Sequence, residues 1–224
     1  MSNSVLIVAA HPDDETLGMG GSIKVLSDLG YEINVLFLSS GVGSRSIERQ
    51  SSVARKKSAE SALSILGCHN FEFMDFPDNR FDSLEILDLA RVIERKIGKV
   101  QPEIVFTNHY ADLNIDHRIT CEAAKIAVRP KSESFVNELY FFEIPSSTGW
   151  NFGSNIFIPH FYVNISNTIE SKMKALLEYS VELDEPPNAR SLLSLEALSV
   201  QRGSSVGYSN AEAFEVGFIR KNLR

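Results

Sequence analysis

Predominantly apolar runs, separated by helical stretches, are the feature that most limits how this chain can fold. The first run, VLIVAA (Val5–Ala10), has no polar position, and INVLFLSS (Ile33–Ser40) follows after one helical segment. Strands that are apolar on both faces are typical of parallel sheets that helices cover on both sides. The two runs therefore predict two parallel strands that flank one helix.

The same alternation continues through residue 144. Further helices are predicted near 47–66, 84–97 and 116–128, and further strands at 71–76, 103–108 and 138–144. Because crossovers between parallel strands are right-handed, this order predicts an α/β fold with a Rossmann-like, mainly parallel sheet and helices on both faces. A strand at 157–166 and helices at 168–179 and 191–202 are predicted as a C-terminal extension. No linker divides the sequence, so a single domain, 1–224, is predicted.

The composition disfavours several classes of partner. A net charge of −7 over 224 residues argues against nucleic acid, whose binding relies on a broad Lys/Arg surface. No apolar run reaches the roughly 18 residues of a membrane span, and no basic residue precedes the first run as in a signal peptide. Cys68 and Cys121 form no C-x-x-C pattern. We therefore expect a cytoplasmic protein without stable membrane insertion, for which a homo-oligomer is possible.

Acidic residues and histidines follow two of the predicted strands. HPDDE (His11–Glu15) comes directly after the first strand, and NHYADLNIDHR (Asn108–Arg118) begins where the fourth strand ends. Taken alone, each cluster is more typical of a turn and a capped helix start. Ligands of open α/β sheets bind at the carboxyl ends of strands, however, so two such clusters would share one site if their strands are neighbours.

The residue types in these clusters suit a metal-dependent hydrolase. Such a site needs three protein ligands, an open position for water and one further carboxylate as a base. His11, Asp14 and His117 supply the three ligands, and Asp13 supplies the further carboxylate. A cation would also offset the crowded negative charge of HPDDE. Zn²⁺ is the predicted metal, while Fe²⁺ or another divalent ion suits the same ligand set.

At this point the sequence resembles a known family. AHPDDE with the later DLNIDHR is similar to the PIG-L/LmbE-like family of zinc-dependent sugar de-N-acetylases, and shorter matches such as SILG, FEIPSST and the tail QRGSSVGYSNAEAF extend the resemblance over most of the chain. The resemblance implies that His11, Asp14 and His117 bind the metal and that Asp13 is the general base. It also implies a small-molecule substrate, an N-acetylated amino sugar or its conjugate.

The chain departs from this family at Asn114. Several members have a histidine here, in the pattern H-x-D-H, which is thought to stabilise the oxyanion or to protonate the leaving amine. An Asn amide can donate a hydrogen bond but cannot deliver a proton at neutral pH. We therefore predict Asn114 as an oxyanion donor, with a turn-shaping role as the alternative. Asp13, once protonated, is the predicted acid, and His109 is the reserve candidate, with a loop histidine of no catalytic role as the alternative.

Weaker predictions concern residues near these motifs. Asp116 is predicted either to orient a neighbouring side chain or the His117 ring, or to cap a helix. Asp78 is predicted either to bind sugar hydroxyls or to form a turn. A structural role is favoured for Arg190. The remaining basic candidates, which could bind a phosphate but look more like a solvated helix face, are Arg45, Arg49 and Arg55.

Two other functions compete with hydrolysis. A dinucleotide-dependent oxidoreductase needs G-x-G-x-x-G in the first turn, whereas HPDDET would place carboxylates where the pyrophosphate binds. A non-catalytic metal- or sugar-binding module is the closer alternative, because Asn114 replaces a histidine. The sequence favours a zinc-dependent N-deacetylase.

Overall fold

All seven strands formed by the described residues lie in one sheet. The computed structural model describes residues 3–41, 51–130, 136–150, 152 and 156–221. In chain order the strands are β1 (Ser4–Ala9), β2 (Glu32–Ser39), β3 (Asn70–Phe76), β4 (Ile104–Asn108), β5 (Glu138–Phe142), β6 (Phe161–Asn164) and β7 (Ala211–Ile219). Their order across the sheet is β3-β2-β1-β4-β5-β7-β6. The first five are parallel, and β7 is antiparallel to β5 and β6, which confirms the mainly parallel α/β fold.

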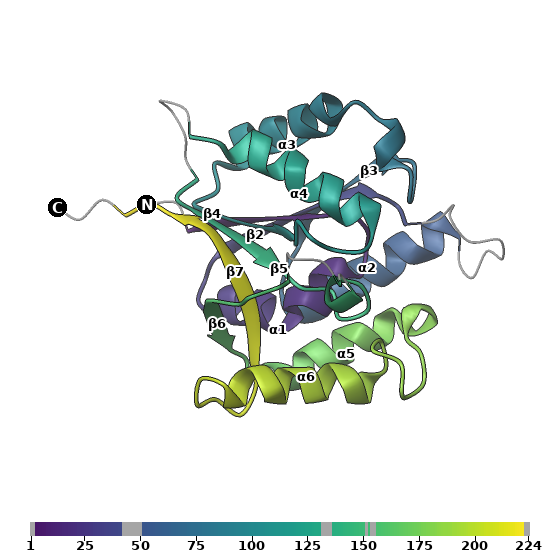
Figure 1. Ribbon diagram of the computed structural model, residues 1–224, viewed down its shortest axis with the longest axis vertical. Coiled ribbons are helices and arrows are strands. Elements are labelled where there is room, and N and C mark those ends of the chain that lie inside the picture. The colour runs from purple at the N-terminus through teal and green to yellow at the C-terminus, as the bar shows by residue number, and fades with distance from the viewer. Residues whose placement is uncertain (1–2, 42–50, 131–135, 151, 153–155, 222–224) are drawn as a thin grey trace.

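Helices cover both faces of this sheet. They are α1 (Asp14–Asp28), α2 (Ser52–Leu66), α3 (Ile86–Val100), α4 (Ile115–Val128), α5 (Ile169–Glu178) and α6 (Leu192–Ser204), with short 3₁₀ turns η1 (Phe81–Ser83), η2 (Thr148–Trp150) and η3 (Ser180–Glu182). α3 and α4 lie on one face, and α1, α2, α5 and α6 lie on the other (Figure 1). The predicted helices are thus confirmed within a few residues, except that 47–50 lies outside the described ranges. None of the described helices is long and apolar enough to cross a membrane.

Strand β1 explains the first apolar run, because both of its faces are covered. Val5, Ile7 and Ala9 pack into the core beside α1, α2 and α5, whereas Leu6, Val8 and Ala10 pack into the core beside α3 and α4. Burial contributes about 0.8 kcal/mol for each methylene group, so neither face favours a polar residue. Since β1 is an inner strand of the sheet, His11, two residues after its end, lies at the carboxyl edge between the neighbouring strands β2 and β4.

The last strand, β7, was not predicted from the sequence. It carries Glu212 and Glu215, and both are buried. Each acid has a partner, since Glu212 pairs with Lys172 Nζ at 2.6 Å and Glu215 faces His109 Nε2 at 3.1 Å. Buried acids of this kind interrupt the apolar pattern by which strands are predicted. The strand predicted at 157–166 is also shorter than expected, because only Phe161–Asn164 pair with β7.

Helix α1 is broken at Met19, whose φ of −152° is not helical. After the break, the backbone N–H groups of Gly21 and Ser22 donate to the carboxylate of Glu212 at 3.0 and 2.6 Å. A carboxylate at a helix start satisfies N–H groups that have no partner within the helix. The tail of the chain therefore supports the second half of α1.

Candidate metal centre

The strand order brings the two motif regions together. His11 follows β1, Asp14 begins α1, and His117 lies in the first turn of α4, after β4. β1 and β4 are parallel neighbours, so their carboxyl ends lie at the same edge of the sheet. The helices that follow them, α1 and α4, cover opposite faces (Figure 1). Open α/β sheets bind their ligands where the chain turns to opposite faces in this way.

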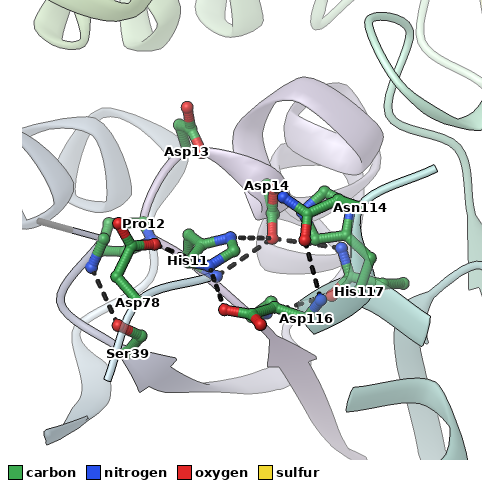
Figure 2. A network of polar contacts seen from close by, with 12 residues as sticks. His11, Pro12, Asp13, Asp14, Ser39, Asp78, Asn114, Asp116 and His117 are labelled. Atoms are coloured by element: carbon green, nitrogen blue, oxygen red, sulfur yellow. Dashed lines mark hydrogen bonds and ion pairs between the residues drawn. The ribbon is translucent and has the colours of Figure 1, made fainter. Parts of the chain in front are cut away.

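His11, Asp14 and His117 form one compact, buried group, and we refer to these three residues as the candidate metal centre (Figure 2). His117 Nε2 lies 3.3 Å from Asp14 Oδ1, and His11 Nδ1 lies 3.8 Å from Asp14 Oδ2. One ligand atom from each residue lies within 4.8 Å of the other two. Three side chains from two motif regions thus present two nitrogens and a carboxylate to one another.

The Asp14 carboxylate is fixed on one side only. Its Oδ2 accepts hydrogen bonds from His11 N at 3.0 Å and from Asn108 Nδ2 at 3.1 Å. Its Oδ1 is buried and faces His117 Nε2 at 3.3 Å, but it accepts no hydrogen bond of good geometry from the described residues. A buried carboxylate oxygen without a donor is costly, and a carboxylate oxygen with two imidazole nitrogens is a donor set that zinc binds. The group therefore fits a divalent metal ion, for which Asp14 Oδ1 is the available acceptor.

Further carboxylates contact the ring nitrogens of the two histidines that do not face Asp14. His11 Nε2 lies 3.0 Å from Asp116 and 3.1 Å from Asp78, and His117 Nδ1 lies 3.1 Å from Asp112. Histidines that bind metals usually donate their second ring N–H to such a carboxylate, which fixes the ring and its tautomer. Asp116, which was expected to orient a neighbouring side chain or the His117 ring, contacts the ring of His11. Asp78 also faces His11 and is buried.

The charges of this group depend on one another. Burial lowers the pKa of His11, but Asp116 and the other acids outweigh burial and raise it to about 9. Burial also lowers the pKa of His117, and Asp14 together with Asp112 raises it to about 10. For Asp14, burial raises the pKa, while the two imidazoles hold it well below its usual range. A metal ion must displace these ring protons, because only neutral imidazole coordinates.

Asp13 lies apart from the candidate metal centre in Figure 2, although it precedes Asp14 directly. It is the residue before α1 and has a φ of 114°, a conformation that non-glycine residues rarely adopt. Its carboxylate is buried, and Oδ2 lies 2.7 Å from Arg190 Nη1 and 3.3 Å from Arg55 Nη2. Strained backbone of this kind is common at functional sites. The turn directs the two adjacent carboxylates to different neighbours.

Arg55 is therefore not part of a solvated helix face, and that interpretation was wrong. Its side chain is buried, pairs with Glu182 and donates from Nη2 to the backbone oxygen of Pro12 at 2.8 Å. Arg45 and Arg49, the other two arginines considered with it, lie outside the described residues. The guanidinium of Arg55 supports the turn that carries Asp13, because Pro12 and Asp13 are its direct partners.

Asn114 is the N-cap of α4. Its Oδ1 accepts a hydrogen bond from Asp116 N at 2.8 Å, and its Nδ2 donates to Asn79 Oδ1 at 3.1 Å. The turn-shaping role is therefore present in the structure. These two bonds use one hydrogen of Nδ2 and leave the second for another acceptor.

His109 lies in a different environment. Its Nδ1 accepts from Ala111 N at 3.2 Å, and its Nε2 faces Glu215 Oε2 at 3.1 Å. Its ring lies 4.2 Å from that of Tyr110 and 5.2 Å from that of Phe157, measured between centroids. Burial lowers the pKa of His109 more than Glu215 raises it. These contacts lead toward β7 rather than toward the candidate metal centre.

Sequence reasoning missed several residues that complete the site. Asn108 links the two strand ends, since its Oδ1 accepts from Ala10 N at 3.0 Å while its Nδ2 donates to Asp14. A polar residue at the end of an apolar strand was a signal for it. Tyr179 donates to Glu15 at 2.8 Å, and burial raises the pKa of Glu15 to about 7. No sequence pattern indicates a contact between residues so far apart.

Known proteins resemble this chain in sequence and in fold. The family model described as PIG-L, GlcNAc-PI de-N-acetylase, matches residues 6–128. The uncharacterized deacetylase YaiS of Escherichia coli K12 is 32% identical over 149 residues, or 64% of this chain and 75% of YaiS. The 4-oxalmesaconate hydratase of Pseudomonas putida KT2440 is 33% identical over 136 residues, or 55% of this chain and 51% of the hydratase. The crystal structure of the conserved protein TT1542 from Thermus thermophilus has a TM-score of 0.81 and 25% identity, and the match covers 100% of this chain and 98% of TT1542.

The family match covers more than half of the chain, and it contains both motif regions. All three residues of the candidate metal centre lie within it, as do Asp13 and Asn114. Arg190, by contrast, lies in the C-terminal part beyond the match. On the strength of the matched residues and the shared sheet, this chain belongs to the PIG-L family of de-N-acetylases.

Proposed function

We propose that this protein is a zinc-dependent N-deacetylase that removes the acetyl group from an N-acetylated amino sugar or its conjugate. The observation that carries the proposal is the buried group of His11, Asp14 and His117, in which Asp14 Oδ1 has no hydrogen-bond donor among the described residues. Asp13, which precedes Asp14 directly in the sequence, supplies a separate buried carboxylate. Membership of a de-N-acetylase family supports the reaction, and the GlcNAc group in the description of that family supports the sugar.

Each residue has a distinct task in this proposal. His11, Asp14 and His117 would hold the metal, and Asp116 and Asp112 keep their rings oriented. Bound zinc supplies a Lewis acid for the amide carbonyl and lowers the pKa of a bound water toward neutrality. Fe²⁺ or another divalent ion is the alternative, because the same ligand types bind it.

Asp13 is the proposed general base. Arg190 and Arg55 both bind Oδ2, which leaves Oδ1 to accept the proton of the attacking water. The same carboxyl group then delivers the proton to the nitrogen of the leaving amine as the C–N bond breaks. Asn114 Nδ2 donates its second hydrogen to the oxyanion. His109, the reserve proton donor, is packed against Glu215 and aromatic rings, which favours a structural role for it.

Other parts of the proposal concern the setting of the protein. We propose a single domain, because one sheet contains the strands of both the first part and the C-terminal extension. We also propose a cytoplasmic location, which the unpaired, buried Cys68 and Cys121 support, since disulfides are rare in reducing compartments. A small-molecule substrate is proposed as the ligand, in place of nucleic acid.

A hydratase is the second candidate, since a relative that is 33% identical is named 4-oxalmesaconate hydratase. Hydration also needs an activated water and a base, but it adds water to a carbon–carbon double bond and releases nothing. The two reactions therefore differ in their products.

Mass spectrometry separates the candidates. Zinc-loaded protein is incubated with a panel of N-acetylglucosamine derivatives and, separately, with an unsaturated dicarboxylate. The proposal expects the loss of one acetyl group from a sugar and the release of an equal amount of acetate, and no reaction with metal-stripped protein. Addition of water to the dicarboxylate without acetate release from any sugar would favour the hydratase. Sugar binding without turnover would favour a non-catalytic module.

A further inference from the structure

Three consecutive hydroxyl side chains, Ser146, Ser147 and Thr148, follow β5 and have no task in the proposed reaction. All three bond to side chains that hold a site residue. We propose that this segment, the hydroxyl turn (Ser146–Thr148), is a positioning element that fixes His117 on one side and Asp13 on the other. The His117 arm concerns metal binding, and the Asp13 arm rests on the proposed function.

The His117 arm runs through Asp112. Thr148 Oγ1 donates to Asp112 Oδ2 at 2.5 Å, and Ser147 Oγ donates to the same oxygen at 2.9 Å. The other oxygen, Oδ1, faces His117 Nδ1 at 3.1 Å. Two hydroxyl donors on one oxygen hold the plane of the carboxylate, so the second oxygen stays aligned with the imidazole ring. The hydroxyl turn therefore determines which ring nitrogen of His117 is directed at Asp14.

The Asp13 arm runs through Arg190. Arg190 Nε donates to Ser146 Oγ at 2.9 Å, and Arg190 Nη1 lies 2.7 Å from Asp13 Oδ2. A guanidinium group is planar, so a bond at Nε restricts the direction in which Nη1 can point. Arg55 lies slightly farther from the same oxygen, at 3.3 Å. Ser146 thus limits the position of the proposed base through the arginine that binds it most closely.

The hydroxyl turn itself is firmly held. Backbone N–H groups of Ser147 and Thr148 donate to Ile144 O at 2.9 and 2.8 Å, and Ile144 N donates to Thr148 Oγ1 at 2.8 Å. Leu113 N donates to Ser147 O at 3.3 Å, which ties the turn to the loop before α4. Thr148 is buried, and its oxygen both accepts from Ile144 and donates to Asp112. One rigid turn therefore contacts both arms, and the catalytic positions of the two motif regions depend on it.

The charges around Asp13 argue against a simpler use of Arg190 as an anion-binding group for the substrate. Arg190 and Arg55 both face Asp13, and both also face Glu182. Two guanidinium groups are thus matched by two carboxylates. An anionic substrate would have to displace one of these buried partners, and the geometry favours positioning instead.

The first test measures zinc binding to metal-stripped protein by competition with a chromophoric chelator. Loss of a direct outer partner of a metal ligand usually costs about 10–100-fold in affinity, and Thr148 acts one step farther out, through Asp112, so Thr148→Val should weaken zinc binding by up to about 10-fold. Thr148→Ser keeps the hydroxyl and should restore the affinity. Thr120→Val is the matched control, because Thr120 is a buried threonine of α4 whose hydroxyl has no partner among the described residues. Ser147→Ala carries the test if Thr148→Val does not fold.

The second test measures kcat, KM and zinc content for Arg190→Lys and Ser146→Ala. Both variants should keep zinc, and kcat should fall by about 10-fold or more with little change in KM, since displacement of a reacting group by about 1 Å can cost 10²-fold. Arg202→Lys is the matched control, because Arg202 pairs with Glu143 instead.

Unchanged zinc affinity in Thr148→Val, or an equal loss in Thr120→Val, would overturn the His117 arm.

Unchanged kcat in Arg190→Lys would overturn the Asp13 arm. A wild-type protein that releases no acetate from any sugar of the panel would overturn the proposed function and the Asp13 arm together. The zinc titration would still decide the His117 arm, since it does not depend on turnover. The failure of each idea is therefore distinguishable.

Discussion

Buried histidines beside carboxylates occur in two regions of this molecule, and the pKa of the histidines is shifted in opposite directions in the two regions. At the candidate metal centre, the pKa of His11 is raised to about 9 and that of His117 to about 10. Next to β7, the pKa of His109 is lowered, although Glu215 lies 3.1 Å away. All three imidazoles are buried.

The number of carboxylates accounts for the difference. His11 faces three, Asp14, Asp78 and Asp116, and these outweigh the loss of water around the ring. His109 faces one carboxylate and is otherwise packed against aromatic rings, so the loss of water prevails. Contact with a carboxylate therefore does not by itself indicate a charged or ligating histidine. The raised pKa of His11 depends on the three carboxylates that face its ring.

The largest expected effect concerns the acids of the two regions. Asp13→Asn should retain zinc and lose about 10²–10⁴-fold in kcat, because the carboxamide cannot take the proton of water. Glu215→Gln also removes a buried negative charge next to a basic side chain, and its kcat should change little. Acetate release and zinc content of both variants test the contrast. Equal losses in the two variants would show that the acids do not differ in function.

Metal binding provides the next contrast. Loss of an outer partner of a metal ligand costs about 10–100-fold in affinity. His11→Gln removes a ligand itself, so it should weaken zinc binding by more than that. His109→Gln should bind zinc as tightly as the wild type. Chelator competition on metal-stripped protein measures both. Zinc binding that is the same in His11→Gln and the wild type would remove His11 from the metal ligands.

Asn114 gives a smaller effect and separates its two roles. Asn114→Ala should lower kcat by about 10²-fold, as loss of one oxyanion donor does, and should cost about 1 kcal/mol of stability because α4 loses its cap. Asn114→Asp keeps a capping oxygen but has no N–H, so it should retain stability and still lose turnover. Normal turnover per folded molecule in Asn114→Ala would rule out the oxyanion role.

The smallest effect is a pH dependence of stability in the second region. Because the folded-state pKa of His109 lies below its unfolded value near 6.5, the unfolded chain binds more protons at acid pH. The stability from neutral His109 is therefore present above about pH 6.5 and is lost as the pH falls through the lower folded-state pKa. His109→Gln should flatten this acid limb. Urea unfolding between pH 5 and 8 measures it, and an unchanged acid limb would contradict the assignment.

The regular part of the fold was predictable from the sequence because single elements carried their own signals. Val5–Ala10 has the unbroken apolar pattern of a strand covered on both faces, and the helix at 116–128 was predicted within one residue of its start. β7 was not predictable, since Glu212 and Glu215 are stabilised by partners elsewhere in the chain. A local sequence pattern indicates only whether a residue favours burial by itself. The burial of these two acids depends on tertiary contacts that the pattern does not contain.

The candidate site divides in the same way. His11, Asp14 and His117 were found because each follows a strand end, where α/β sheets bind ligands. The contact of Arg190 with Asp13 joins residues 177 positions apart, and no spacing rule indicates it. Arg55 was predicted to be solvent-exposed because its neighbours Lys56 and Lys57 are charged. Its side chain is buried because it contacts Pro12 and Glu182, which are distant in the sequence. The predicted ligands and the acids near them in the motifs were thus visible in the sequence, whereas the contacts of Arg55 and Arg190 with Asp13 were not.

The carboxylate of Glu212, which binds Gly21 N and Ser22 N, has a consequence for the order in which the molecule can be assembled. During synthesis the residues of α1 leave the ribosome first, and Glu212 leaves it about 190 residues later. β7 also separates β5 from β6, so the sheet is incomplete until the last strand inserts. Contacts so distant in sequence slow folding. We therefore expect the sheet and the second half of α1 to stay incomplete in the nascent chain until β7 has left the ribosome.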